Sequence, residues 1–423
     1  MKLYPHQEEA LALIKDKNRC AIYYDMGLGK TYIGSEKVKD LKSKVNLVIC
    51  QKSKVNDWVQ HFENNYHFKV LDLTKQGQLN EFLGMVQSEK YILIGVINYD
   101  LVWRRPDLLH LSNFTLLLDE SSLITNRTAK RSKFILALDP INVILLSGTP
   151  TAGRYEKLWS QLKLLGWNID EETFFKSYVD YEWVETDDGF WEKKIKGYKN
   201  VDHLKRRLAK FGAIFKKTNE VIDLPDQVEQ MIYILPSKEY KFFKKNHYLE
   251  IEDKELMGDT ILTRILYERQ LCGQYSEDKL KAFRDLLEST EDRFVVFYNF
   301  NDEWHKLEAI TDELGRPSGV VNGQFKNPEV LDKYDNSVIF VQYQAGAYGL
   351  NLQKANRIIY YSLPLGLGSC DLWEQSKKRI HRMGQDKTCF YYYLLVKDSI
   401  EIWNLELLRT GKELTDDLFK EAT

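Results

Sequence analysis

The chain has 423 residues, 43% of them apolar and 29% charged, which is enough for about two to three domains and excludes a disordered protein. Lys and Arg total 60 and Asp and Glu total 62, so overall charge predicts no nucleic-acid partner, and only a local basic surface could bind one. Five scattered cysteines without a CxxC pair, a polar N-terminal segment and the lack of a long uncharged apolar run exclude a typical zinc site, a signal peptide and a membrane helix, so we expect a cytoplasmic protein without a membrane partner.

Short β-rich apolar runs alternate with helix-like stretches in two regions of the chain, as parallel sheets covered by helices require. The runs of the first region are 20–24, 45–50, 91–97, 114–118 and 142–146. Those of the second region are 293–298, 319–322, 338–342, 357–361 and 390–396. The pattern predicts an α/β protein with two doubly wound parallel sheets, whose ligands lie at the carboxyl ends of strands.

The segment between the two regions is rich in helix-like stretches, Lys and aromatic residues. Polar and aromatic residues alternate within 181–198 around Asp188-Gly189, a strong signal for a hairpin turn. We predict an aromatic hairpin there, with either of two roles. Its aromatic residues pack on neighbouring helices, or Trp183 and Trp191 stack on bases. The predicted parts of the chain are a first domain 1–153, a helix-rich protrusion 154–279 and a second domain 280–423.

A phosphate-binding loop is predicted directly after the first apolar run, where the sequence reads DMGLGKT (25–31) before a helix-like stretch. Gly27 and Gly29 allow backbone N–H groups to turn toward phosphate oxygens at a helix N-terminus. In this arrangement Lys30 reaches the β- and γ-phosphates of a nucleotide, and the Thr31 hydroxyl is a ligand for Mg²⁺. The alternative is a glycine-rich turn that carries a Lys-Thr pair by chance.

A second half of the same site is predicted at Asp119-Glu120, which directly follow the apolar run 114–118. A buried strand that ends in two carboxylates suits the hydrolysis of ATP. Asp119 would hold Mg²⁺ through water, and Glu120 would orient and deprotonate the attacking water.

Two arginines near the C-terminus are candidates for the stabilisation of transition-state charge. Gln375, Arg379 and Arg382 are spaced four and three residues apart, so on a helix they would share one face. Two guanidiniums aimed at a γ-phosphate from another domain act as arginine fingers do, and such a finger can contribute roughly 10³–10⁵ in rate. The alternative is an exposed basic helix.

Taken together, these motifs resemble those of the Swi/Snf-like translocases of helicase superfamily two. The similar segments fall in the family's order: LYPHQ (3–7), DMGLGKT (25–31), VICQKS (48–53) followed by Trp58, NY (98–99), DESS (119–122), LSGTP (146–150), FYNF (297–300), AGAYGLNL (345–352) and QSKKRIHRMGQ (375–385). The resemblance implies two RecA-like domains that bind ATP and Mg²⁺ in a cleft between them. It also implies that Gln7 pairs with adenine and that Gln375, with the two arginines, completes the ATP site from the second domain.

The resemblance further implies a motor that moves along double-stranded DNA without reading its sequence. Phosphate contacts of this kind position the protein but carry no sequence information. The candidate contacts within the family's motifs are Lys52, Ser53, Asn98 and Asn299. A basic stretch of the protrusion, 193–217, is a candidate second DNA surface or else a solvated helix face. Its candidate contacts are Lys205, Arg206 and Arg207.

The chain departs from the family's usual residues at a few positions that do not include the ATP-site residues: Ser122, Gly153, Gln342, Tyr343 and Ser362. Its compact length resembles phage or mobile-element members of the family. We expect a monomer in the cytoplasm, which would be the host cytoplasm if the protein is phage-encoded. The motifs identify no protein partner.

Alternative functions share part of the same motif set. A P-loop NTPase without a nucleic-acid track needs no second sheet with paired arginines. A strand-separating or branch-migrating DNA helicase, or an RNA helicase, shares every residue of the ATP site. An ATP-gated DNA clamp would bind ATP and DNA without turnover, and the intact Glu120 argues against it.

Overall fold

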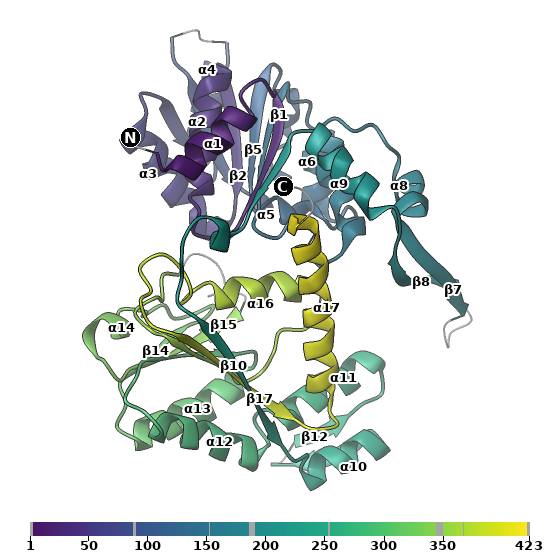
Figure 1. Cartoon of the computed structure of the whole chain (residues 1–423), viewed down its shortest axis with the longest axis vertical. Coiled ribbons are helices and arrows are strands. Elements are labelled where there is room, and N and C mark those ends of the chain that lie inside the picture. The colour runs from purple at the N-terminus through teal and green to yellow at the C-terminus, as the bar shows by residue number, and fades with distance from the viewer. Residues whose placement is uncertain are drawn as a thin grey trace. The chain divides into compact units, whose positions relative to one another are not determined.

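The computed structural model describes residues 3–87, 90–151, 153–185, 191–252, 254–343, 350–366 and 368–420, the last six of these by their backbone alone. The chain forms two compact units. The first comprises the chain up to Ile222 and again from Glu413, and the second comprises Asp223–Lys412. Each unit contains a parallel sheet of its own (Figure 1).

The sheet of the first unit has seven strands in the order β3-β4-β2-β5-β6-β1-β9, and every neighbouring pair is parallel. The strands are β1 (Arg19–Tyr24), β2 (Val45–Cys50), β3 (Lys69–Asp72), β4 (Leu93–Asn98), β5 (Phe114–Asp119), β6 (Asn142–Leu146) and β9 (Ala213–Lys216).

Alternate residues of each central strand enter cores on opposite faces of this sheet. In β2, Leu47 and Ile49 pack into one core, and Val48 and Cys50 pack into the other. A strand that is buried on both faces needs an unbroken apolar run, which is why these strands were recognisable in the sequence.

Helices cover both faces of the first sheet. One face is covered by α1 (Pro5–Leu13), α2 (Lys30–Leu41) and α3 (Val55–Asn65). The other face is covered by α4 (Gln76–Met85), α5 (Tyr99–Val102), α6 (Lys130–Ala137), α7 (Trp159–Leu164), α8 (Glu171–Tyr178) and α9 (Val201–Lys210).

The sheet of the second unit has six strands in the order β10-β17-β16-β13-β15-β14, again all parallel. The strands are β10 (Gln227–Ile234), β13 (Phe294–Tyr298), β14 (Ser318–Val321), β15 (Val338–Gln342), β16 (Arg357–Tyr360) and β17 (Cys389–Val396), and a separate antiparallel pair consists of β11 (Tyr248–Ile251) and β12 (Lys254–Met257).

This second sheet is also covered on both faces. One face packs against α10 (Lys238–Asn246), α11 (Ile261–Cys272), α12 (Glu277–Glu288) and α13 (Asn301–Glu313). The other packs against α14 (Val330–Lys333), α16 (Ser369–Lys377) and α17 (Ile400–Lys420). Among the described residues of both units, none of the helices combines the length and apolar character needed to cross a bilayer.

The predicted fold class is confirmed, and each of the ten predicted apolar runs is a strand. Three strands of the two sheets were not predicted: β3, β9 and β10. Both β3 and β9 are four-residue edge strands. β10 is mostly exposed, and three of its first four residues are polar, so it lacks the continuous apolar run that marks a strand buried on both faces.

The two units divide the chain elsewhere than at the predicted boundaries 153/154 and 279/280. Within the predicted protrusion 154–279, β9 pairs with β1 of the first sheet, and β10 pairs with β17 of the second sheet. The described part of this segment is therefore shared between the two units, and the division falls after Ile222.

The predicted aromatic hairpin is present as two antiparallel strands, β7 (Val179–Glu185) and β8 (Trp191–Tyr198). The predicted turn at Asp188-Gly189 lies outside the described residues. The hairpin leaves the first unit after α8 and returns to it at α9 (Figure 1).

A buried ion pair joins two helices in the second unit. Lys279 of α12 donates to the Glu401 carboxylate at the start of α17 over 2.5 Å, and the side chains are 0% and 7% exposed. The other carboxylate oxygen of Glu401 accepts the Val396 N–H at the end of β17, over 2.9 Å. Burial raises the pKa of Glu401, whereas the Lys279 charge lowers it.

We predict that Lys279→Met destabilises the protein by about 3–5 kcal/mol, because it leaves the Glu401 carboxylate buried without its cation. The variant also raises the Glu401 pKa further. A raised pKa means that the folded protein binds the Glu401 proton more tightly than the unfolded chain does, so stability is lost as the pH rises. The thermal midpoint of the variant should therefore lie less far below that of the parent at pH 5 than at pH 8.

The control is Lys254→Met, which removes an exposed ion pair with Asp302 and should change stability by less than about 1 kcal/mol. Equal effects of the two substitutions would contradict the assignment of Lys279–Glu401 as a structural pair.

Candidate active site

The predicted phosphate-binding loop connects β1 to α2 in the first unit. Gly27 has φ 83°, and Gly29 has φ 71° at the residue that precedes α2. Both values lie in the left-handed region that glycine adopts at little cost. The loop therefore ends at the N-terminus of α2. The free N–H groups of a helix N-terminus and the helix dipole favour the binding of an anion.

The Lys30 ammonium lies across this loop. It donates to the carbonyl of Tyr24 over 2.7 Å and to that of Asp25 over 3.2 Å. A Cβ atom added at Gly148 would lie 3.6 Å from the Lys30 Nζ atom. The segment after β6 thus passes beside the ammonium, and the backbone of the loop holds it in place.

Gln7 of α1 packs directly against the same loop. Its Oε1 atom accepts the Tyr4 N–H over 2.9 Å, and its Nε2 atom donates to the Leu28 carbonyl over 3.5 Å. A Cβ atom at Gly29 would lie only 2.2 Å from Gln7 Nε2, so Gly29 is needed for its φ angle and for this contact. The structure brings Gln7 to the loop, and its pairing with adenine stays a prediction.

The Asp119 carboxylate at the end of β5 is held by a residue from α3. The Trp58 indole N–H donates to Asp119 Oδ2 over 2.8 Å. Burial raises the pKa of Asp119, while the Trp58 hydrogen bond and the Lys30 charge both lower it. From the sequence, Trp58 could be named only as part of a motif, because its contact with Asp119 depends on how α3 packs on the sheet.

Glu120 follows with φ 56° and ψ 61°, a left-handed conformation that costs a non-glycine residue about 1–2 kcal/mol. The Tyr99 hydroxyl donates to the Asp119 carbonyl over 2.9 Å and approaches the Glu120 carbonyl at 3.4 Å. Strain of this kind persists where surrounding contacts enforce it, and it often marks functional positions.

A buried glutamine that the sequence did not indicate connects three segments of this site. The Gln161 Oε1 atom accepts the Ser121 hydroxyl over 2.7 Å and the Tyr23 hydroxyl over 3.0 Å. Its Nε2 atom donates to the Pro150 carbonyl over 2.6 Å. Gln161 therefore links β1, the turn after Glu120 and the loop after β6.

The predicted Mg²⁺ ligands are Thr31, in the first turn of α2, and Asp119. In the part of the chain that the structure describes, no group of three or more His, Cys, Asp or Glu side chains could hold a metal by itself. One carboxylate and one hydroxyl suit Mg²⁺, which keeps several waters and takes further ligands from substrate phosphates.

In the second unit, the prediction that Gln375, Arg379 and Arg382 share one helix face is wrong. Helix α16 ends at Lys377, so only Gln375 lies on it. The helix stops because the chain turns, with the Arg379 N–H bonded to the Ser376 carbonyl and the Arg379 carbonyl accepting the Leu352 N–H.

Both arginines nevertheless contact the same short segment after β15. Arg379 is 7% exposed and donates to the Leu350 carbonyl over 3.2 Å. Arg382 donates to Asn351 Oδ1 over 2.6 Å, and burial lowers its pKa. The segment 345–349 of this predicted motif lies outside the described residues.

Polar side chains meet at the carboxyl ends of β13 and β16. The Asn299 Nδ2 atom donates to Ser362 Oγ over 2.8 Å and to the Leu363 carbonyl over 3.0 Å. Ser362 in turn donates to the buried Glu303 carboxylate over 2.7 Å. Ser362, one of the positions that depart from the resemblance, is thus hydrogen-bonded to a buried acid.

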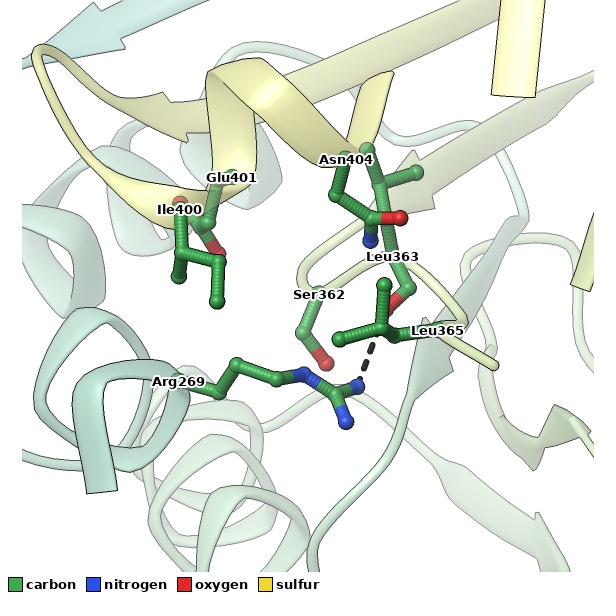
Figure 2. Close-up of a pocket in the computed structure, with 7 residues that line it drawn as sticks. All are labelled: Arg269, Ser362, Leu363, Leu365, Ile400, Glu401 and Asn404. Carbon is green, nitrogen blue, oxygen red and sulfur yellow. Dashed lines mark hydrogen bonds between the residues drawn. The ribbon is translucent and has the colours of Figure 1, made fainter. Parts of the chain in front are cut away.

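The same end of the sheet contains a small cavity that separates this cluster from the start of α17. Arg269 points into it and donates to the Leu363 carbonyl over 3.1 Å, opposite Asn404 and Glu401 (Figure 2). The Asn299 side chain already donates hydrogen bonds to Ser362 and to the Leu363 carbonyl within this unit. These bonds do not favour its predicted contact with DNA.

The other predicted DNA contacts separate into exposed and buried residues. Lys52 and Ser53 are exposed in the 3₁₀ turn η1 (Lys52–Lys54) before α3. Asn98 is buried, so its side chain is not available for the predicted contact with DNA.

On α9, Arg206 is exposed and Arg207 is partly exposed, so their contact with DNA stays a prediction, but the prediction that Lys205 belongs to the same surface is wrong. Lys205 is 2% exposed, and the Arg207 guanidinium lies 4.6 Å from the centre of the Trp167 ring. The helix is amphipathic, and Lys205 falls beside Leu204 and Leu208 on its buried side.

These features define a P-loop α/β architecture in two parts, and comparison with known families agrees with it. The sequence pattern of the SNF2-related domain matches residues 6–277, and that of the helicase conserved C-terminal domain matches residues 278–384. The first match covers more than half of the chain, which therefore belongs to the SNF2-related family.

Similar proteins carry SWI/SNF and helicase names. The chain is 23% identical over 429 residues to the SWI/SNF-related matrix-associated actin-dependent regulator of chromatin subfamily A-like protein 1 of Xenopus tropicalis, which covers 94% of this chain and 43% of that protein. It is 24% identical to the DNA annealing helicase and endonuclease ZRANB3 of Bos taurus, over 98% of this chain and 40% of that protein. It is 23% identical to an uncharacterized ATP-dependent helicase, YqhH, of Bacillus subtilis, over 96% of this chain and 77% of that protein.

The chain thus spans less than half the length of the first two relatives. Among solved structures, the Sulfolobus solfataricus SWI2/SNF2 ATPase core in complex with dsDNA covers 99% of this chain and 93% of its own, at 20% identity and a TM-score of 0.46.

We predict that Trp58→Phe raises the Mg²⁺ concentration for half-maximal ATP hydrolysis by roughly 10–100-fold, the usual cost of losing a hydrogen bond to a metal-binding carboxylate. Loss of the indole N–H also removes a contact that lowers the Asp119 pKa. The acid limb of the kcat/KM profile should therefore move to higher pH.

Trp159→Phe is the matched control, because it removes an indole hydrogen bond of 3.0 Å to the Ile169 carbonyl in the same unit. If Trp58→Phe changes neither Mg²⁺ dependence nor the acid limb, or if the control changes both equally, Trp58 does not position Asp119.

Proposed function

We propose that this protein is a DNA-dependent ATPase that uses ATP hydrolysis to move along double-stranded DNA. The observation that carries the proposal is the convergence of Lys30, Asp119 and Glu120 at the carboxyl edge of the first sheet. Their strands β1 and β5 are separated only by β6, whose following loop lies beside Lys30. Membership of the SNF2-related family supports the same function.

The residues of the first unit suit the binding of a nucleoside triphosphate. Backbone N–H groups of the loop and the Lys30 ammonium would neutralise the β- and γ-phosphates. Thr31 and Asp119 would hold Mg²⁺, which supplies charge neutralisation for the phosphates. Glu120 would accept the proton of the attacking water, and its strained backbone fixes where its carboxylate can reach.

The second unit would contribute the remaining positive charge. Arg379 and Arg382 are both oriented by the 350–351 segment, so a shift of that segment would move both guanidiniums together. We propose that they act on the γ-phosphate of the nucleotide bound by the first unit, with Gln375 beside them. DNA would stimulate hydrolysis by favouring this arrangement.

Double-stranded DNA is proposed as the track from the family and from the relative named as a DNA annealing helicase. The exposed Lys52 and Ser53 would contact phosphates, so binding should be independent of sequence and sensitive to salt. Lys52 leads through η1 into α3, whose Trp58 holds Asp119. These contacts would connect the proposed DNA contact directly to the proposed Mg²⁺ site.

We predict that duplex DNA stimulates ATP hydrolysis and that the protein displaces the third strand of a DNA triplex without unwinding the duplex. Lys30→Ala should abolish turnover, and Glu120→Gln should abolish turnover while ATP still binds. Lys39→Ala, on the same helix but in an exposed pair with Glu36, should leave turnover unchanged.

The panel of nucleic acids should include single-stranded DNA, duplexes, forks, four-way junctions and RNA. Stimulation by RNA alone would overturn the proposed substrate, and strand separation of forks or junctions would establish the helicase alternative. Binding of ATP and DNA with zero turnover in the parent protein would establish a clamp.

A further inference from the structure

The β7–β8 hairpin has one face that is built differently from the other. Directly paired residues share a face, and the register pairs Trp183 with Lys193 and Glu185 with Trp191. One face therefore carries Trp183, Trp191, Lys193, Tyr181 and Ile195, and Glu185 also lies on it, opposite Trp191. The opposite face carries ion-paired residues, of which Lys196 and Glu182 lie 2.7 Å apart.

The two tryptophans of this face are exposed. Trp183 is 55% and Trp191 is 62% exposed. Of the three aromatic residues, Tyr181 packs on a helix, with its ring 5.2 Å from that of Phe175 in α8. The expectation that the hairpin packs its aromatic residues on neighbouring helices therefore holds for Tyr181 but not for either tryptophan.

The base of the hairpin is firmly attached to the first unit. The Tyr198 hydroxyl donates to the Glu156 carboxylate over 2.7 Å, and its ring lies 4.9 Å from that of Tyr155. The Lys199 N–H donates to the Tyr178 carbonyl over 3.0 Å. An isolated two-stranded hairpin is marginally stable in water, so these contacts give the exposed strands a rigid support.

A single cation lies at the centre of the aromatic face. The Lys193 ammonium lies 5.0 Å from the ring centres of Phe175 and Tyr181 and 5.3 Å from that of Trp183. The described hairpin, 179–185 with 191–198, contains four acids against three lysines. The face itself carries one cation, Lys193, and one carboxylate, Glu185. A ligand would thus be bound through its flat surfaces and not through general attraction of phosphates.

We infer that the Trp183–Trp191 face binds unpaired bases of a nucleic acid strand, in addition to the duplex contacts of the α/β units. Every base has an aromatic face, so stacking on tryptophan is independent of sequence. Lys193 is placed to pair with the phosphate next to a stacked base. This inference rests on the proposed function, since it assumes that DNA is the substrate, and it assigns forks and other partly single-stranded DNA to the hairpin.

A protein partner fits this face less well. A fully buried aromatic side chain removes roughly 150–250 Å² from water, so two tryptophans fall well short of the ~800 Å² per partner of a stable protein interface. Two or three bases, in contrast, match the size of the exposed surface.

The test measures binding of three DNAs to the full chain: a single strand that contains 2-aminopurine, a fork and a blunt duplex. Trp183→Ala/Trp191→Ala should weaken single-strand and fork binding by roughly tenfold or more and should leave duplex affinity and duplex-stimulated ATP hydrolysis unchanged. The salt dependence of binding should stay the same in this variant. Lys193→Ala should reduce its slope by about 0.7, as expected for the loss of one single-strand phosphate contact.

Trp403→Ala removes another exposed tryptophan, 52% exposed on α17, and should bind all three DNAs like the parent. Trp183→Phe/Trp191→Phe should retain most of the fork affinity, because phenylalanine still stacks. Equal fork affinity of the parent and the double alanine variant would overturn the inference, and so would an equal loss of duplex-stimulated hydrolysis, which would make the tryptophans structural. A parent that binds none of the DNAs would overturn the proposed function itself.

Discussion

The protonation state of the Asp119 carboxylate is the constraint on which the proposed site of the first unit depends. This carboxylate ends a buried strand, where burial disfavours its charged form, yet its proposed role as a Mg²⁺ ligand requires that form. The Trp58 hydrogen bond and the Lys30 ammonium offset that cost. Because Trp58 belongs to α3 and Lys30 to α2, the packing of both helices on the sheet lowers the pKa of a single side chain that burial raises.

Other contacts extend this dependence to the remainder of the site. Gly29 has no side chain, so Gln7 can pack against the loop that carries Lys30. Beyond Glu120, Ser121 is tied through Gln161 to the Pro150 carbonyl. Movement of the loop after β6 would therefore shift the turn after Glu120, the proposed general base. Such a connection gives the loop a physical means to couple hydrolysis to events elsewhere in the protein.

The strands and the position of the phosphate loop could be predicted because each has a local signature. A strand buried on both faces shows an apolar run, and a phosphate loop needs its glycines and lysine in sequence. Trp58 and Gln161 lack such a signature, since their roles arise from packing between distant segments. The prediction of a helix through Arg379 was wrong, because the Arg379 carbonyl accepts a hydrogen bond from the distant Leu352 N–H. Lys205 was mistaken for a surface residue because a basic run does not reveal which side of a helix is buried. The division after Ile222 was missed because β9 is a short edge strand and β10 is mostly exposed and begins with polar residues.

The central claim of the proposed function is that the nucleotide site of the first unit is completed by arginine from the second. The most direct measurement compares single-turnover ATP hydrolysis and ATP affinity in the parent and in Arg379→Ala, with duplex DNA present and with thermal midpoints recorded for both. The account predicts a rate lower by roughly 10³-fold or more, with ATP affinity and thermal midpoint unchanged. A rate within a few-fold of the parent, or a loss of rate explained by a lower thermal midpoint, would contradict it.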